Sequence, residues 1–433
     1  MTEKLIIKNF AGIEELEIEV KKINILIGSE TSGKSICAKL LFYFKSFFSQ
    51  MSLIIEGGNT KEDLDTDYSR KFTEYFPRNS WSKNDFYIKY EIANEFISIN
   101  RNENQNAGVS LDYSPYFSNF FDKSSEDLEI MTSRKFLINK EYENYDKISK
   151  LYVISKQFKG EFFHNLSNHF KKDIKFDQLY ILSGRSFFSI FNRNLYLFYS
   201  QKINVDPFLL SFGLSYEDIK DLRESFHNRI YKSIEKQKSQ SEIKKLAEDS
   251  LRAKYIRQDG QDFLLHSDGR KVSITNASSG QQELLPLTII LEALPHMAPS
   301  SLGYTVYVEE PEAHLFPSTQ RNIIELMATV FNSCEDKLQL FITTHSPYVL
   351  TAINNLLQAG QIYETADEST QKKLEEILPK YKSLHTADVA AYSLSEGRCQ
   401  NIINSETGLI DAQIIDSVSE DLAIQFDELL DLI

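Results

Sequence analysis

Short apolar runs separated by turn residues fill the first 50 positions of the chain. Residues 4–10 and 16–20 alternate between apolar and polar positions, which predicts two adjacent strands joined by a turn. A third apolar run, 23–27, ends at a glycine, and the apolar residues of 35–48 then recur at helical spacing. The segment is therefore expected to form three strands and a helix.

The pattern changes between residues 56 and 256. Residues 85–99 predict a strand pair, whereas 124–175 and 215–256 predict charged helices. The apolar spacing of the second helical stretch fades after a few turns, so a long coiled coil is not expected. We interpret residues 56–256 as an insertion, a strand pair followed by a helical arm or lid.

Core-like alternation returns near residue 257. Strands are predicted at 263–265, 272–274, 304–308 and 338–343, with helices at 281–294 and 318–331. Strands that alternate with helices indicate an α/β fold with a mainly parallel sheet. We expect a split core of residues 1–55 and 257–360, and a helical tail over 361–433 that packs on the core or on a partner subunit.

Composition narrows the class of protein. The 433 residues carry a net charge of -14, which argues against a general nucleic-acid binder. The most apolar stretch, 284–294, is far shorter than the roughly 20 residues that cross a bilayer. The first residues lack the apolar segment of a signal peptide, and the three cysteines are scattered. We expect a cytoplasmic protein without a membrane partner.

The first candidate motif follows the apolar run 23–27 and matches GxxxxGK[ST]. It consists of Gly28, Ser29, Glu30, Thr31, Ser32, Gly33, Lys34 and Ser35. A strand, this loop and a helix form the phosphate-binding P-loop, whose backbone N–H groups surround the phosphates of ATP. Lys34 would neutralise the β- and γ-phosphates and Ser35 would ligate Mg²⁺. The alternative is a chance match in a glycine turn.

Two further apolar strands end in polar residues. The run 304–308 ends in Glu309 and Glu310, and the run 338–343 is followed by His345. Glu309 is expected to hold Mg²⁺ and Glu310 to orient and deprotonate the attacking water, while His345 would reach the water or the γ-phosphate. An acidic strand end and a structural histidine are the simpler interpretations.

A serine- and glycine-containing segment precedes the helix predicted at 281–294. Its residues Ser278, Ser279, Gly280 and Gln281 resemble the ABC signature, in which a helix start contacts the γ-phosphate of a second subunit. The simpler interpretation is an N-cap, with Ser279 as the cap and Gln282 or Glu283 as its reciprocal partner. Both interpretations are compatible, since the cap geometry also presents the amides.

The order of these motifs resembles ABC-type ATPases grouped with the SMC proteins, their DNA-repair relatives and the OLD family. The phrases SSGQQE (278–283), EEPEAHLFP (309–317) and TTHSPYVL (343–350) are similar to bacterial antiphage ATPases, among them the Septu (PtuA) and PARIS (AriA) subunits. The resemblance implies an ABC-type core with a mixed sheet and antiparallel N-terminal strands. It also implies ATP and Mg²⁺ as cofactors, slow regulatory ATP hydrolysis and head-to-tail dimers or larger homo-oligomers.

The same resemblance suggests what surrounds the ATPase. The stretch after His345 lacks a TOPRIM or HNH nuclease pattern, so we expect a separate nuclease or toxin effector, triggered by nucleic acid or a phage protein. Arg185, in the phrase LYILSGRS (179–186), would face the nucleotide or the dimer interface, or else form a buried ion pair. Glu309 stands where many relatives have aspartate, and Glu30 where asparagine is frequent.

A DNA-maintenance or repair ATPase that grips DNA is the alternative function. This alternative is supported by a run of basic residues between 232 and 257. The simpler interpretation of the same residues is a solvated helix surface.

Overall fold

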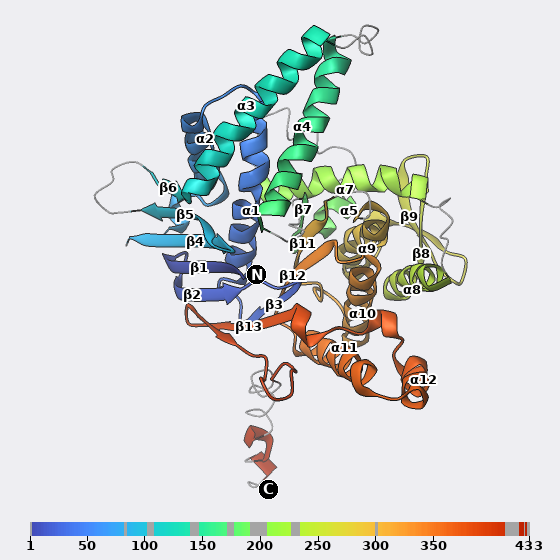
Figure 1. Cartoon of the computed structure of the whole chain (residues 1–433). Coiled ribbons are helices and arrows are strands. Elements are labelled where there is room, and N and C mark those ends of the chain that lie inside the picture. Colours follow the sequence, from blue (N-terminus) through green and yellow to red (C-terminus); the bar gives the residue numbers. More distant parts are fainter. Residues whose placement is uncertain are drawn as a thin grey trace.

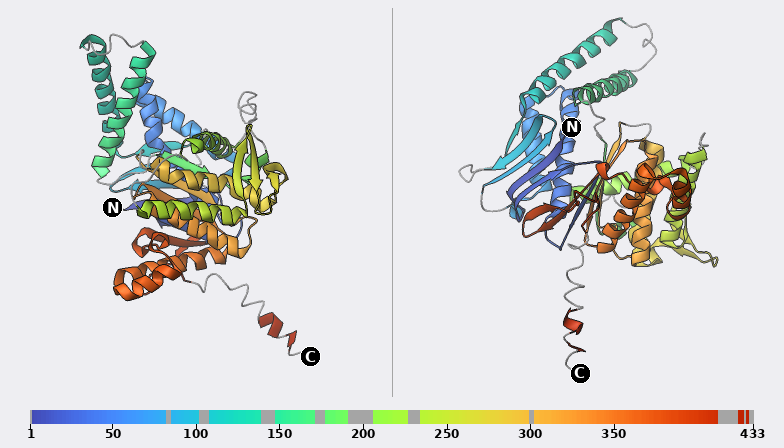
Figure 2. Two further views of the ribbon diagram at one scale, coloured as in Figure 1. Left: turned by 90° about the vertical axis from the view of Figure 1, so that its right-hand side faces the viewer. Right: turned by 60° about the horizontal axis from the view of Figure 1, so that its bottom comes forward.

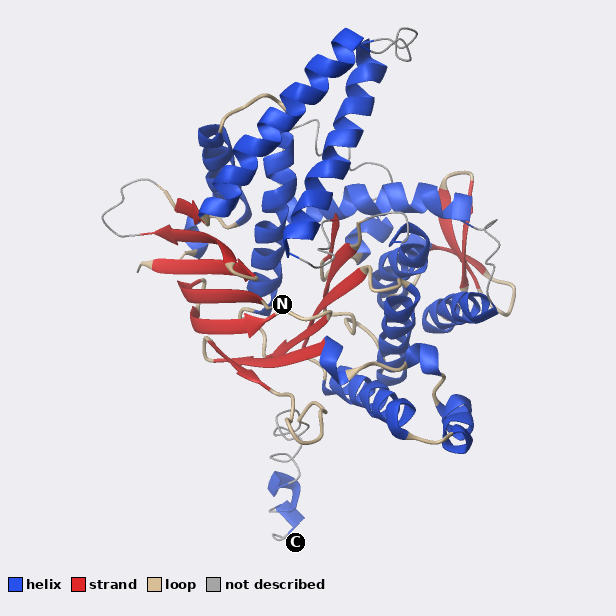
Figure 3. Cartoon of the chain, viewed as in Figure 1, coloured by secondary structure: helices blue, strands red, loops and turns tan. Residues whose placement is uncertain are grey.

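One 11-stranded sheet crosses the molecule, and helices cover both of its faces (Figures 1 and 3). The computed structural model describes residues 2–81, 85–101, 108–138, 147–170, 177–190, 206–226, 234–298, 302–411, 424–427 and 429–430. The predicted class, α/β with a mixed sheet and antiparallel N-terminal strands, is confirmed.

The sheet has an antiparallel half and a parallel half. In sheet order its strands are β6 (Ser110–Tyr113), β5 (Glu95–Arg101), β4 (Phe86–Ile92), β1 (Glu3–Phe10), β2 (Ile13–Glu19), β14 (Arg398–Asn401), β13 (Val389–Ser395), β3 (Ile23–Gly28), β12 (Leu338–Thr344), β11 (Tyr304–Glu309) and β7 (Asp177–Ile181). Neighbours from β6 to β2 pair antiparallel, and neighbours from β13 to β7 pair parallel. A second, three-stranded antiparallel sheet contains β10 (Lys271–Ser273), β9 (Gln261–Leu265) and β8 (Lys254–Gln258).

Alternation along the central strands divides the core into two layers. Val306 and Val308 of β11 face one buried cluster, whereas Tyr307 between them faces the other. The Tyr307 side is covered by α1 (Lys34–Glu56), α2 (Lys61–Tyr75), α3 (Pro115–Ile138) and α4 (Lys147–Phe170). The valine side is covered by α7 (Pro207–Phe226), α8 (Ile234–Leu251), α9 (Ser279–Met297), α10 (Pro317–Ser333) and α11 (Pro347–Thr365). Figure 2 shows these layers from two further directions, with α3 and α4 projecting from the body.

Most predicted elements are present, although several lie in unexpected places. β4, β5 and β6 belong to the interval that we interpreted as an insertion, yet they extend the main sheet beside β1. The tail was expected to be helical, and α12 (Glu368–Ile377) is, but β13 and β14 are strands of the main sheet. Residues 412–423, 428 and 431–433 of the tail lie outside the described residues. The division into split core, insertion and tail stays a prediction.

Within the part of the chain that the structure describes, every helix is too short or too polar to cross a membrane.

Candidate nucleotide-binding site

Three neighbouring parallel strands deliver the predicted motifs to one edge of the sheet. β3, β12 and β11 pair in register, with Ile27 opposite Thr344 and Thr343 opposite Glu309. Each strand therefore ends at the same level, and the polar residues that follow them meet outside the carboxyl ends. This is the place where ligands bind in open parallel sheets.

The P-loop has the backbone of an anion-binding turn. Gly33 precedes α1 with φ of 98°, and Thr31 also has a positive φ of 62°. A Cβ on Gly28 would lie 2.3 Å from the carbonyl oxygen of Leu394 in β13, so only glycine fits there. No side chain caps α1 and no acidic residue lies in its first turn. Because the loop directly precedes α1, the positive end of the helix faces it, as phosphate binding requires.

Lys34 folds back over this loop. Its Nζ atom donates to the carbonyl oxygens of Gly28 at 2.9 Å and Ser29 at 2.6 Å, and lies 3.2 Å from Oγ of Ser32. The side chain is buried, and this desolvation lowers the pKa of Lys34, which nearby glutamates including Glu310 partly oppose. A phosphate group would replace these carbonyl acceptors and restore the favourable environment of the ammonium.

His345 joins the ammonium of Lys34 to the carboxylate of Glu310. Its Nδ1 atom lies 3.4 Å from Nζ of Lys34, and its Nε2 atom lies 3.2 Å from Oε1 of Glu310. These neighbours favour the tautomer that accepts at Nδ1 and donates from Nε2. Glu310 itself adopts a left-handed backbone with φ of 43°, an unfavourable conformation for a residue with a Cβ. The structure thus brings Lys34, His345 and Glu310 together.

Glu309 is buried beside the end of β7. Its Oε1 atom accepts a hydrogen bond from the hydroxyl of Tyr180 at 2.7 Å, and its Oε2 atom accepts from the backbone N–H of Ser183 at 3.2 Å. Each oxygen keeps a further lone pair. A carboxylate and the hydroxyl of Ser35 are the hard oxygen donors that Mg²⁺ prefers, so these residues fit the expected metal.

Glu312 was not anticipated from the sequence and holds the histidine in place. Its Oε1 atom accepts from the hydroxyl of Thr344 and from the backbone N–H of His345, both at 2.7 Å. The loop is tied further by Ser346, whose hydroxyl donates to Oε1 of Gln320 at 2.6 Å. The only sequence signal for Glu312 was its place within the acidic phrase EEPEAH.

The signature segment begins α9, but its cap differs by one residue from the expectation. Ser278, not Ser279, is the N-cap, and Gln281 rather than Gln282 or Glu283 completes the capping box. Ser278 and Ser279 are exposed. A Cβ on Gly280 would lie 2.9 Å from the carbonyl oxygen of His314, so the helix start packs tightly on the segment after Glu310.

Arg185 lies in the interior of the chain. Its side chain is fully buried and lies 3.7 Å from Oε2 of Glu283. Of the two interpretations drawn from the sequence, the buried ion pair is the observed one. Its guanidinium also donates to backbone carbonyl oxygens at the end of β7, the start of α9 and the end of β11.

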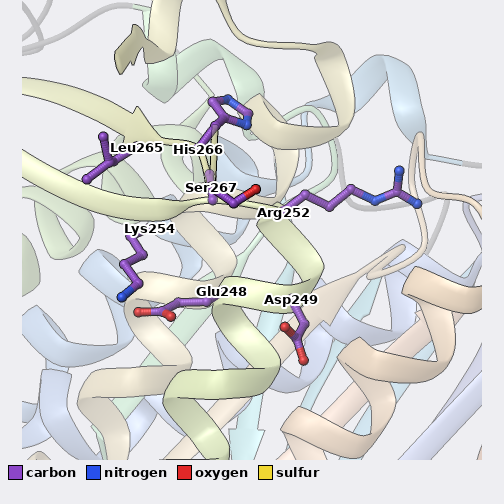
Figure 4. A pocket seen from close by; sticks show the side chains of 8 residues that line it. Glu248, Asp249, Arg252, Lys254, Leu265, His266 and Ser267 are labelled. Carbon is purple, nitrogen blue, oxygen red and sulfur yellow. The ribbon is translucent and has the colours of Figure 1, made fainter. Parts of the chain in front are cut away.

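A concave surface lies beyond the signature helix. The pocket has a volume of about 520 Å³ and is lined by Glu248, Asp249, Arg252, Ala253, Lys254, Leu265, His266 and Ser267 (Figure 4). Gln281 of the signature bonds to the residue before the lining Arg252, because its Nε2 atom donates to the carbonyl oxygen of Leu251 at 2.8 Å. The lining contains two acidic and two basic side chains besides His266, so the pocket favours no single charge.

Comparison with known proteins supports the class that the motifs indicate. Residues 199–350 match the family described as AAA ATPase domain, about a third of the chain that includes the signature, Glu309, Glu310 and His345 but not the P-loop. The chain is also 26% identical over 152 residues to the Retron Ec83 probable ATPase of Escherichia coli. That match covers 28% of this chain and 27% of the relative, so it spans about a quarter of the relative's length.

Solved SMC head structures are similar over most of the chain. One SMC head, bound to the C-terminal winged-helix domain of ScpA, aligns with 93% of this chain and 96% of its own at 12% identity and a TM-score of 0.38. The SMC head domain from Thermotoga maritima aligns with 93% and 98% at 11% identity and a TM-score of 0.36. TM-scores below 0.5 do not establish a shared fold. The assignment as an ATPase therefore rests on the chain's own motifs and on the family match. Together these support an ATPase of the AAA type with ABC-type motifs.

Proposed function

We propose that the chain binds and slowly hydrolyses ATP at the edge formed by β3, β12 and β11. The observation that carries this proposal is the continuous contact from Lys34 through His345 to Glu310. Lys34 and the amides of the P-loop bind the phosphates, and Ser35 and Glu309 hold Mg²⁺, which when bound supplies charge neutralisation at the β- and γ-phosphates. Glu310 orients the attacking water and accepts its proton, while His345 contacts the water or the γ-phosphate.

We further propose that the working site needs two copies of the chain. Ser278 and Ser279 are exposed at the start of a capped helix, where they are accessible to the γ-phosphate held by a second subunit. Complementation tests this arrangement. A Lys34→Ala chain and a Ser279→Asp chain are each expected to be inactive, and their mixture regains activity because the mixed dimer contains one intact composite site. Two inactive chains whose mixture stays inactive would contradict the head-to-tail dimer.

Within a cell, we propose that this ATPase is the sensor or scaffold of an antiphage complex with a separate nuclease or toxin effector. The similarity to a retron ATPase supports this role, and so does the resemblance of three phrases to Septu and PARIS subunits. The test is phage plating on cells that carry the chain and its neighbouring genes. At least tenfold fewer plaques are expected with the wild type, and full plating with Lys34→Ala. Protection that survives Lys34→Ala would contradict the proposal.

DNA binding is the second candidate, favoured by the exposed lysines of α8. Lys238, Lys244 and Lys245 are exposed, whereas Lys236 forms an ion pair with Glu335, and Lys232 lies outside the described residues. Duplex binding that depends on ATP, weakens with salt and is lost in a Lys244→Glu, Lys245→Glu variant would support this function.

A further inference from the structure

The end of β7 and the start of α5 (Ser186–Ile190) lie between two parts of the candidate ATP site. One part is the end of β11 with its two glutamates, and the other is the start of α9 with the signature. The hydroxyl of Tyr180 and the backbone N–H of Ser183 bind the two carboxylate oxygens of Glu309. The connecting segment therefore contacts the first part directly.

The same segment also contacts the signature helix. The hydroxyl of Ser189 donates to the carbonyl oxygen of Gln282 at 2.6 Å, and the backbone N–H of Ser186 donates to Oε1 of Glu283 at 3.2 Å. Glu283 is buried, and its Oε2 atom has no hydrogen-bond partner among the described residues. The nearby guanidinium of Arg185 compensates this buried charge.

Arg185 connects both parts through one rigid group. Its Nε atom donates to the carbonyl oxygen of Glu283 at 2.9 Å, its Nη1 atom to that of Glu309 at 2.9 Å, and its Nη2 atom to that of Glu310 at 3.2 Å. The guanidinium is planar and its donors have a fixed geometry. A shift of the α9 start relative to the β11 end must therefore break these bonds or move both elements together.

We propose that Arg185 is a positioning residue that couples the signature of one ATP site to the hydrolytic glutamate of the other. In the proposed dimer, a chain's signature contacts the ATP bound by its partner, whereas its Glu310 acts on its own ATP. Phosphate contact at α9 is transmitted through Arg185 to the backbone of Glu310, whose left-handed conformation depends on its surroundings. This inference rests on the proposed function and adds communication between the two sites.

The test compares ATP hydrolysis as a function of ATP concentration for the wild type, Arg185→Lys and Glu283→Gln. The wild type is expected to show a Hill coefficient clearly above 1. Arg185→Lys keeps the charge but loses the planar fork, so kcat falls at least tenfold and the Hill coefficient approaches 1. Glu283→Gln keeps the acceptor for Ser186 and is expected to lose cooperativity with a smaller loss of kcat. The Kd for ATP, measured at the unchanged P-loop, stays within about twofold in both variants.

The matched control is Arg223→Lys. Arg223 also binds a glutamate of α9, Glu292, at 2.7 Å, but this pair lies two helical turns or more along α9 from the signature. The control is expected to keep the wild-type Hill coefficient and kcat.

Three results would overturn the inference. The first is that both variants keep the wild-type kcat and cooperativity. The second is a Hill coefficient of 1 in the wild type. The third is that both variants lose ATP affinity and hydrolysis in parallel, because such losses indicate that Arg185 only maintains the fold. Failure of the proposed function gives a different result. A wild type that neither binds nor hydrolyses ATP contradicts both proposals.

Discussion

Nε2 of His345 lies 3.2 Å from Oε1 of Glu310. The other nitrogen of the ring faces Nζ of Lys34 at 3.4 Å, so the imidazole connects the carboxylate assigned to water activation with the ammonium assigned to phosphate binding. β12 and β11 lie side by side, and this contact follows from their parallel register.

Glu310→Gln is expected to keep ATP binding and lose hydrolysis by about 100-fold or more. An amide still hydrogen bonds with His345 but does not accept a proton from water, and general-base catalysis contributes on the order of 100- to 10,000-fold. Phosphate release and the Kd for ATP measure the two steps separately. Glu368→Gln, at an exposed glutamate of α12 outside the site, is the control and should retain turnover. Wild-type turnover in Glu310→Gln would remove Glu310 from the mechanism.

Glu312→Ala should weaken both folding and catalysis. The change removes the acceptor of the Thr344 hydroxyl and of the His345 N–H, and unsatisfied buried donors cost about 1–3 kcal/mol. We expect the free energy of unfolding to fall by about 2 kcal/mol and kcat to fall several-fold, measured by denaturant unfolding and steady-state kinetics. Glu312→Gln keeps an acceptor oxygen, so its stability and kcat should lie between those of the wild type and those of Glu312→Ala. An alanine variant with unchanged stability and kcat would show that Glu312 does not hold the histidine.

Tyr180→Phe is expected to raise the Mg²⁺ concentration needed for half-maximal hydrolysis. The change removes the hydroxyl that orients the Glu309 carboxylate, and loss of such supporting groups typically weakens metal binding about 10-fold or more. A titration of activity with Mg²⁺ gives the value. Tyr307→Phe is the matched control, because Tyr307 stacks on Tyr180 but its hydroxyl donates to Gln178 instead. Equal Mg²⁺ requirements in both variants would contradict the role of Glu309.

ATP affinity should fall as the pH rises through the lowered pKa of Lys34. Desolvation lowers this pKa in the free protein, and bound phosphate raises it again, so the complex holds more protons than the free protein. The extra affinity is complete below the lowered pKa and is lost above it. Calorimetric titration at a series of pH values below the ordinary lysine pKa of about 10.4 measures the change. Lys34→Arg stays charged throughout and should show a flatter profile, and identical profiles would contradict this assignment.

The sequence predicted the parts of the site that follow strongly apolar strands. The P-loop, Glu309, Glu310 and His345 each end such a strand, and parallel pairing then places them at one edge. β13 and β14 were missed because β13 buries small alanines and β14 has four mostly polar residues, Arg398–Asn401. Contacts made far apart along the chain were also missed, including Tyr180 with Glu309. The position of Arg185 stayed open because burial of an arginine depends on partners that spacing does not reveal.

The two-chain site is the central claim, and its most direct test is the mass of the purified chain in solution. Light scattering with and without ATP and Mg²⁺ compares the wild type, Glu310→Gln and Lys34→Ala. We predict that ATP doubles the mass of Glu310→Gln, which holds ATP without hydrolysing it, and leaves Lys34→Ala unchanged. A Glu310→Gln chain that binds ATP yet keeps the mass of a single chain would contradict the shared site, and Ser278 would then serve only to cap α9.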